Sequence, residues 1–294
     1  MLTMGLQNYG KLNWLQLHLP EGLLVDAAWL QRQGYSSGLR SKYVAHGWLD
    51  QVVRGAYRRP PAKLRPPDED EALRWEHVVI SLQTLLECPL AVGGRTALEL
   101  QGFAHYLTAA GPREIHLYGG ETPPGWVSKL KLEAKLVFHN AEKLFKNGAV
   151  PRQLDAQNAT QADRNTNSDL ARSGFVRQPW GTREWPLIMS SPERAILELL
   201  DEVPRHETFH QADVLMEGLS NLSPRKLHTM LVQCRSVKVK RLFLWFAERH
   251  NHAWLKRLDR EGIDLGRGKR MLARGGKLNT KFSITVPEDL DARG

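Results

Sequence analysis

Cysteine and long apolar runs are what this sequence has least of. Cys88 and Cys234 are its two cysteines, far apart and without a partner motif, which argues against a disulfide framework and a cysteine-based zinc site. No apolar run reaches the ~18 residues that a membrane-spanning helix needs. Residues 1–14 lack the basic start and apolar stretch of a secretory signal. These absences predict a globular protein of the reducing cytoplasm, without a membrane partner.

Recognisable catalytic motifs are also missing. Eleven histidines are scattered along the chain, and no Ser/His/Asp or Cys/His arrangement can be read from it. Glu133-Ala134-Lys135, beside a predicted strand, resembles part of a nuclease core that holds Mg²⁺. The upstream acid of such a core is not found, because neither Glu114 nor Glu121 sits in a Pro-Asp context. We therefore predict a non-enzymatic protein with no cofactor or metal, and keep a Mg²⁺-dependent nuclease using Glu133 and Lys135 as an alternative.

Positive charge is concentrated near the C-terminus. Residues 221–281 hold 16 Lys and Arg against four Asp and Glu, a net charge of +12, whereas residues 1–220 hold 24 against 25. Such a surface predicts a polyanionic partner, most commonly nucleic acid. The alternatives are a solvated helix face and a basic hairpin that caps a helical layer. The cations expected to form the surface are Lys238, Lys240, Arg241, Arg249, Arg267, Lys269, Arg270, Arg274 and Lys277.

The first sixty residues carry a second signal for nucleic acid. Apolar spacing, caps and turn residues predict helix 12–19, strand 23–25, helix 27–33 after an Asp26 cap, helix 38–46, and a hairpin over 49–59. Helix, short turn, helix and β-wing is the winged helix-turn-helix pattern. The side chains expected to pack its small core are Trp29, Leu30, Leu39, Val44 and Trp48.

This pattern predicts which side chains meet DNA. The second helix would turn Ser36, Ser37, Arg40 and Ser41 toward a major groove, where an arginine can bond guanine at two points. The cations placed to neutralise phosphates are Lys42, Arg54, Arg58 and Arg59. A winged helix can also bind protein, but six Lys and Arg against three Asp and Glu across residues 21–60 favour DNA.

The rest of the chain predicts an α+β fold. We expect four units: the winged helix over 1–60, a Pro-rich linker over 61–67, an α/β domain over 68–190, and a basic helical part over 191–294. The expected strands are 114–118, 136–139, 174–180, 185–189 and 282–286. The expected helices are 68–87, 193–200, 209–217, 224–233 and 237–250, with a short one around Trp254.

Two polar side chains in this part of the chain have expected local roles. Thr96 could cap a further short helix, and Arg194 could pair with Glu198 or face a partner. The polar segment 153–172 has no assigned role.

Five stretches together resemble one protein family. They are GWLDQVVRGAYRRP (47–60), VGGRTALELQGFAHYL (92–107), SPERAILELLDEVP (191–204), VKVKRLFLWFAER (237–249) and GKRMLARGGKLNTKFSITVP (268–287). In this order they resemble the AbiEi antitoxins of type IV toxin–antitoxin systems. The resemblance implies an N-terminal winged helix-turn-helix followed by a larger mixed α/β antitoxin domain.

The resemblance also implies partners and a role in abortive phage infection. The family represses its own operon by binding inverted repeats in double-stranded DNA, here through the helix and wing residues named above. It opposes a nucleotidyltransferase toxin, AbiEii, without forming a stable complex. The residues that confer antitoxicity are not marked by a motif, so the basic C-terminal surface is our hypothesis for them. A further alternative is an RNA-binding protein that shields tRNA, the acceptor of such a toxin, through the same surface.

Overall fold

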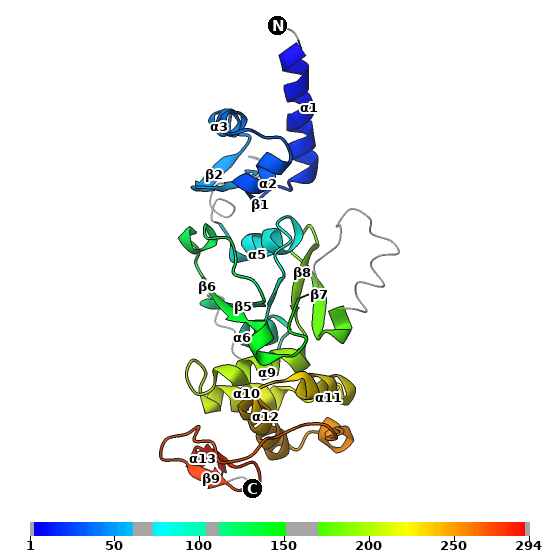
Figure 1. The fold of residues 1–294 in the computed structure, drawn as a ribbon, viewed down its shortest axis with the longest axis vertical. Helices are drawn as coiled ribbons and strands as arrows, with labels where there is room; N and C mark the ends of the chain where they lie inside the picture. The colour runs from blue at the N-terminus through cyan, green and yellow to red at the C-terminus, as the bar shows by residue number, and fades with distance from the viewer. Residues whose placement is uncertain (1–2, 61–72, 104–111, 151–169, 292–294) are drawn as a thin grey trace.

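The computed structural model describes residues 3–60, 73–103, 112–150 and 170–291. Figure 1 shows an elongated molecule with its first helix at one end and its C-terminal hairpin at the other. The predicted linker 61–67 and most of the polar segment 153–172 fall outside the described residues. No helix in the described ranges is both long and apolar enough to cross a membrane.

The N-terminal module follows the predicted order of elements. Its parts are α1 (Thr3–His18), β1 (Leu24–Asp26), α2 (Ala27–Arg32), α3 (Ser37–Ala45), β2 (Asp50–Val53) and β3 (Ala56–Arg58). The strands form an antiparallel sheet in the order β1-β3-β2. Asp26 caps α2 by accepting the Trp29 amide hydrogen at 2.6 Å. Helices α2 and α3 followed by this hairpin form the arrangement expected of a winged helix-turn-helix.

The core of this module differs from the prediction at one aromatic side chain. Trp29 and Leu30 are buried as expected, and Leu39 and Val44 pack partly buried against the core. The exception is Trp48, which is 39 % exposed and stacks on His46 with ring centroids 5.0 Å apart. Tyr43 takes the core position, and its ring packs edge-to-face with that of Trp48. The prediction that Trp48 packs inside was therefore wrong.

A five-stranded mixed sheet forms the middle of the molecule. Its strands are β4 (Leu90–Val92), β5 (Glu114–Gly119), β6 (Lys135–Asn140), β7 (Phe175–Trp180) and β8 (Trp185–Ser190), in the order β6-β5-β4-β8-β7. The β5·β6 and β4·β8 pairs are parallel, and the β4·β5 and β7·β8 pairs are antiparallel. The mixture of helices with this sheet confirms the α+β class.

Several helical segments accompany the sheet in the described ranges. They are α5 (Trp75–Thr84), α6 (Gly94–Leu100), the 3-10 turn η1 (Val127–Lys129) and α7 (Ala141–Leu144). Gln83 of α5 ties two strands together, since its amide donates to the Leu90 and Ile188 carbonyls and accepts the Ile188 amide hydrogen. Within the described residues the predicted helix 68–87 is shorter, because the backbone of Arg74 is still extended before Trp75.

The two glycines that open α6 serve close packing. A Cβ on Gly93 would lie 2.3 Å from the Glu198 carboxylate, and the Gly94 amide donates to that same carboxylate at 3.0 Å. We predicted that Thr96 caps α6, and this prediction was wrong. Its hydroxyl instead accepts the His116 amide hydrogen at 3.0 Å and so joins α6 to β5.

A helical layer and a hairpin complete the chain. They comprise α9 (Pro192–Glu202), α10 (Phe209–Gly218), α11 (Pro224–Gln233), α12 (Val237–His250), the 3-10 helix η2 (Ala253–Arg257), β9 (Lys277–Asn279), β10 (Ile284–Val286) and α13 (Glu288–Asp291). Helix α9 lies across α6 and α12, and α12 also contacts α10 and β10. One continuous hydrophobic core runs from Leu15 to Leu290, so the predicted units pack as neighbours.

Candidate nucleic-acid interface

Local sequence sets both the start and the rotation of α3. The Ser36 hydroxyl accepts the Leu39 amide hydrogen at 3.3 Å, which satisfies one of the free amides at the helix start. Gly34 precedes it with φ +81°, a conformation that glycine adopts without strain. Tyr43 is buried against Tyr35, with ring centroids 5.9 Å apart. The buried Tyr43 leaves the other side of α3 facing solvent.

The solvent face of α3 carries small side chains and one cation. Its exposed residues are Ser37, Gly38, Ser41, Lys42 and Ala45. Helical spacing of three and four residues places them on one side. Small side chains let a helix approach base edges closely in a major groove. The structure thus brings Ser37, Ser41 and Lys42 together as predicted. Sequence reasoning missed Gly38 and Ala45, although their spacing from Ser41 was a usable signal.

Arg40 lies at the edge of this face and is held by the module itself. Its Nη1 donates to the Tyr35 carbonyl at 2.8 Å, and its guanidinium lies 6.0 Å from the centre of the Tyr57 ring. The side chain is half-buried. To bond a guanine, Arg40 has to give up its hydrogen bond to the Tyr35 carbonyl. The base contact therefore stays a prediction.

The wing arginines divide into one exposed cation and two structural ones. Arg54 is exposed in the turn between β2 and β3. Arg58 forms an ion pair with Asp50 at 3.1 Å, across the two strands of the wing. Arg59 donates to the Leu19 carbonyl at 3.2 Å and pairs with Glu21 at 3.1 Å. Lys42 and Arg54 are therefore the predicted phosphate contacts that remain available to a ligand.

The predicted basic surface on α12 is wrong for Lys238 and Arg241. The Lys238 ammonium donates to the Asp201 and Val203 carbonyls, and burial lowers its pKa. Arg241 is 3 % exposed and donates to the carbonyls of residues 265, 268 and 283. These cations hold neighbouring segments in place by bonding their backbone.

Two further α12 cations are also unavailable to a ligand. Lys240 is 5 % exposed, and Arg249 pairs with Asp213 at 2.8 Å while donating to the Leu290 carbonyl. The cause is that α12 is covered by α9, α10 and β10. Its polar positions consequently face other parts of the same chain rather than solvent.

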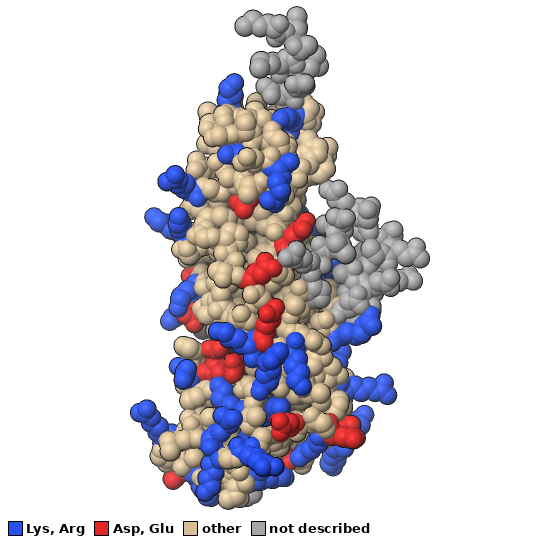
Figure 2. Space-filling view, in the orientation of Figure 1, with Lys and Arg blue, Asp and Glu red and all other residues tan. Residues whose placement is uncertain are grey.

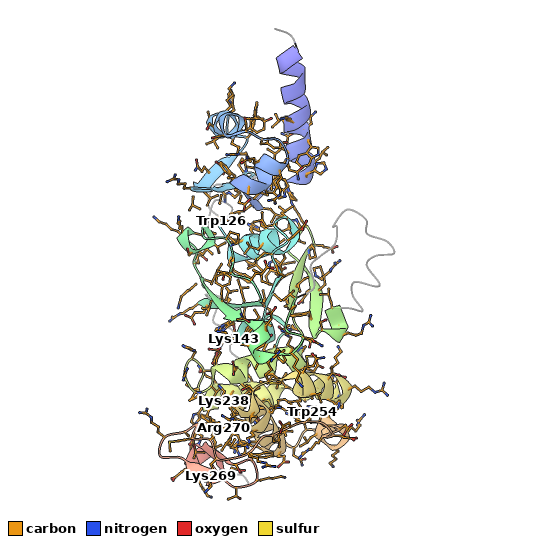
Figure 3. The ribbon with its side chains drawn as sticks, viewed as in Figure 1. Trp126, Lys143, Lys238, Trp254, Lys269 and Arg270 are labelled. Carbon is orange, nitrogen blue, oxygen red and sulfur yellow. The ribbon has the colours of Figure 1, made fainter. Side chains whose placement is uncertain are left out.

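The tail keeps its predicted exposure. Its exposed cations are Arg267, Lys269, Arg270, Arg274 and Lys277. Figure 2 shows Lys and Arg gathered over the C-terminal end of this face, and Figure 3 places Lys269 and Arg270 beside the hairpin. The alternative that the tail packs as a cap on the helical layer also holds, because β10 contacts α12. The structure therefore supports a basic hairpin that both packs on the helices and exposes charge.

Sequence reasoning missed a chain of hydrogen-bonded titratable groups. His116 Nδ1 and His139 Nε2 are 2.9 Å apart, and His139 Nδ1 lies 3.2 Å from one oxygen of Glu202. The other Glu202 oxygen is 2.7 Å from His206. Hydrogen bonding to His139 lowers the pKa of Glu202 to about 2, and burial lowers the pKa of His116. His116, His139 and Glu202 come from β5, β6 and α9, so no spacing in the sequence could have joined them. Glu202 and His206 are four residues apart, and this pair could have been read from the sequence.

The residues of the nuclease alternative do not form a metal site in the structure. Glu133 is exposed and precedes β6, and Lys135 pairs with Glu114 at 3.0 Å. Among the described residues, no group of three or more His, Cys, Asp and Glu is arranged to hold a metal ion.

Comparisons with known proteins cover both halves of the chain. A family model described as "Transcriptional regulator, AbiEi antitoxin N-terminal domain" matches residues 8–109. A second, described as "Transcriptional regulator, AbiEi antitoxin, Type IV TA system", matches residues 113–287. Among solved structures, the RV2827C protein from Mycobacterium tuberculosis is similar at 12% identity and a TM-score of 0.48, over 93% of this chain and 88% of that one. No curated protein gives a significant match.

Proposed function

Because this chain belongs to the AbiEi family of type IV antitoxins and transcriptional regulators, we propose that its N-terminal module binds the operator of its own operon. The solvent face of α3 enters the major groove, and Arg54 at the wing turn neutralises a backbone phosphate. The observation that carries this proposal is the face of small side chains on α3 with Lys42 at its edge. A helix inserted this way positions the wing over the adjacent backbone.

The second half of the proposal concerns the toxin. The protein opposes a nucleotidyltransferase toxin of the AbiEii kind, without a lasting complex, and so acts in abortive phage infection. Repression uses one end of the molecule and leaves the basic C-terminal end for antitoxicity. The arrangement in Figure 1 supports this division, because the N-terminal module and the C-terminal hairpin lie at opposite ends.

Operator binding can be tested with two point variants. Lys42→Ala and Arg54→Ala should each weaken binding to the upstream duplex and lower the slope of log K against log salt by about 0.9, the value for one lost phosphate contact. The measurement is fluorescence anisotropy over a salt titration, with a scrambled duplex of equal length for comparison. Wild-type protein should hold the operator at salt concentrations that release the scrambled duplex.

Lys143→Ala provides the matched control. Lys143 is exposed on α7, in the middle of the molecule (Figure 3), so its loss removes the same charge far from the module. Unchanged operator binding in the Lys42 and Arg54 variants, or an equal loss in the Lys143 variant, would refute the placement of the interface.

A further inference from the structure

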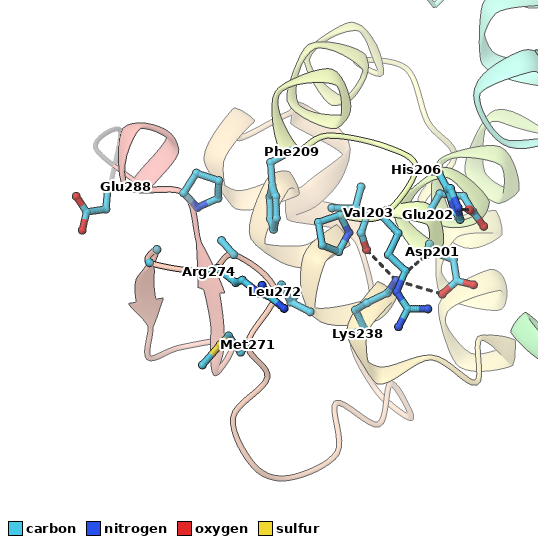
Figure 4. A pocket seen from close by; sticks show the side chains of 16 residues that line it. Asp201, Glu202, Val203, His206, Phe209, Lys238, Met271, Leu272, Arg274 and Glu288 are labelled. Carbon is cyan, nitrogen blue, oxygen red and sulfur yellow. Dashed lines mark hydrogen bonds and ion pairs between the residues drawn. The ribbon is translucent and has the colours of Figure 1, made fainter.

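A groove of about 1180 Å³ opens between the helical layer and the C-terminal hairpin (Figure 4). One wall is the end of α9 with the connection that follows it, residues 201–206, together with Phe209 of α10 and Lys238 of α12. The facing wall is the tail segment 271–276, with Pro287 and Glu288 beyond it. Pockets for small molecules usually measure about 300–1000 Å³. The groove therefore suits an extended ligand better than a compact one.

The acids near α9 are engaged with partners from the same chain. Asp201 lies 3.6 Å from the Lys238 ammonium. Glu202 is held between His139 and His206. The third acid, Glu288, stands on the opposite side of the groove from these two (Figure 4). Both carboxylates on the α9 side therefore already have partners in the same chain, and Glu202 remains an anion because its pKa is lowered to about 2.

Three acids and three Lys or Arg line the groove, so its available positive charge is confined to two exposed arginines. Arg205 belongs to the α9–α10 wall and Arg274 to the tail wall, and both are exposed. Neither forms an ion pair or a side-chain hydrogen bond with any residue that the structure describes. Two cations facing one space from opposite walls attract an anionic ligand that passes between them.

Apolar side chains lie beside these cations. Met271 is 77 % exposed, and Leu272 and Pro287 line the same groove half-buried. An exposed thioether packs well against aromatic rings. Proteins that bind unpaired nucleic acid combine cations that track the backbone with aromatic side chains on which the bases stack. In this groove the exposed thioether of Met271 takes the place of the aromatic side chain. A duplex hides its base faces in the stack and offers no such ring to Met271.

We infer that this groove binds an unpaired strand of nucleic acid. Arg205 and Arg274 each hold a phosphate of the strand, and Met271 packs against a base between them. The site goes beyond operator binding, because it lies at the other end of the molecule and takes a single strand rather than a duplex. An RNA would therefore bind in this groove and not on α12, because Lys238, Arg241 and Arg249 of α12 bond carbonyls of their own chain.

The inference is tested by anisotropy with the full chain and fluorescein-labelled strands of about 12 nucleotides, one RNA and one DNA, without self-complementarity. Replacing Arg205→Gln together with Arg274→Gln should weaken binding about tenfold near 0.15 M salt and lower the salt slope by about 1.4, for two lost phosphate contacts. Met271→Ala should weaken binding several-fold and leave the salt slope unchanged. Loss of affinity without a change in slope is the mark of a base contact.

Matched controls make the outcomes distinct. Replacing Arg225→Gln together with Arg257→Gln removes the same charge from exposed positions outside the groove, and binding should stay near the wild-type value. Equal losses in both double variants, equal affinity for duplex and single strand, or equal competition by an acidic peptide would each overturn the inference. The Lys42→Ala and Arg54→Ala variants should bind the strand normally, so failure at the groove and failure at the operator are separable.

Discussion

Arg194 carries its charge in the interior of the protein. Its side chain is fully buried, pairs with Glu198 at 2.8 Å, and donates to the Ser173 carbonyl at 3.0 Å. The guanidinium lies between the Phe145 and Phe175 rings, at 4.4 and 4.1 Å from their centres. Of the two roles that the sequence left open, pairing with Glu198 is confirmed, and facing a partner is wrong.

Removing one member of this pair should destabilise the fold. Arg194→Met leaves Glu198 buried without its cation, which is expected to cost about 3–5 kcal/mol of unfolding free energy. Adding Glu198→Gln should restore much of that loss, because an amide oxygen can still accept the Gly94 amide hydrogen. Urea unfolding of both single variants and the double variant measures the coupling. Losses that simply add would show that the pair does not act as a unit.

At the scale of elements, the histidine chain ties β5 and β6 to the end of α9. His116 is 6 % exposed on β5, and its pKa is lowered by burial and by the neighbouring His139. Because the pKa of His116 is lower in the folded protein, the unfolded chain binds a proton at this residue more readily. Stability contributed by neutral His116 is therefore present above about pH 6.5 and is lost as pH falls toward the lower folded pKa.

This gives a pH window that can be measured. The melting temperature should fall as pH drops below about 6.5, and His116→Asn should flatten the curve there. Glu202 acts in a lower window: its pKa of about 2 contributes stability above about pH 4.5 that is lost as pH falls to 2. Differential scanning fluorimetry from pH 7 to 4 checks the upper window. An identical slope in His116→Asn would exclude His116 as its cause.

Element boundaries show what local chemistry specifies. The caps at Asp26 and Ser223 accept amide hydrogens of the helices they precede, as residue type and spacing predict. Ser36, which we expected to face DNA, also proves to be a cap. Ser191 has the cap conformation before α9, but its side chain makes no cap hydrogen bond. Thr96 was misread, because a β5 backbone group far along the chain competes for its hydroxyl. Local patterns locate a helix more reliably than they assign its polar side chains.

At the scale of the whole molecule, repression and toxin neutralisation should separate. The combined Lys42→Ala and Arg54→Ala variant should lose repression of a reporter driven by its own promoter. It should still restore growth to cells that express the toxin, because the C-terminal end is unaltered. Loss of both activities would contradict the division of labour.

Point variants suit this test better than deletion of residues 1–60. The N-terminal module packs on the rest of the chain: the Leu24 amide donates to Ser81 of α5 at 2.8 Å, and Glu21 pairs with Arg183 at 2.6 Å. A deletion would strip α5 of this cover and expose apolar surface. A failure of the truncated protein could then reflect unfolding rather than a lost function.

The sequence by itself determined the order of the N-terminal elements and of helices α9 to α12, the α+β class, the family and the position of the +12 charge along the chain, but it did not predict β4, the middle strand of the sheet. These follow from turn residues, caps and apolar periodicity, which act between residues close in sequence. Only the tertiary structure decided which cations reach solvent, because α12 is enclosed by elements distant in sequence. It alone brought His116, His139 and Glu202 together, and it set Arg205 across a groove from Arg274. Burial and long-range pairing depend on how the whole chain packs, and packing decides whether a charge binds its own backbone or a partner.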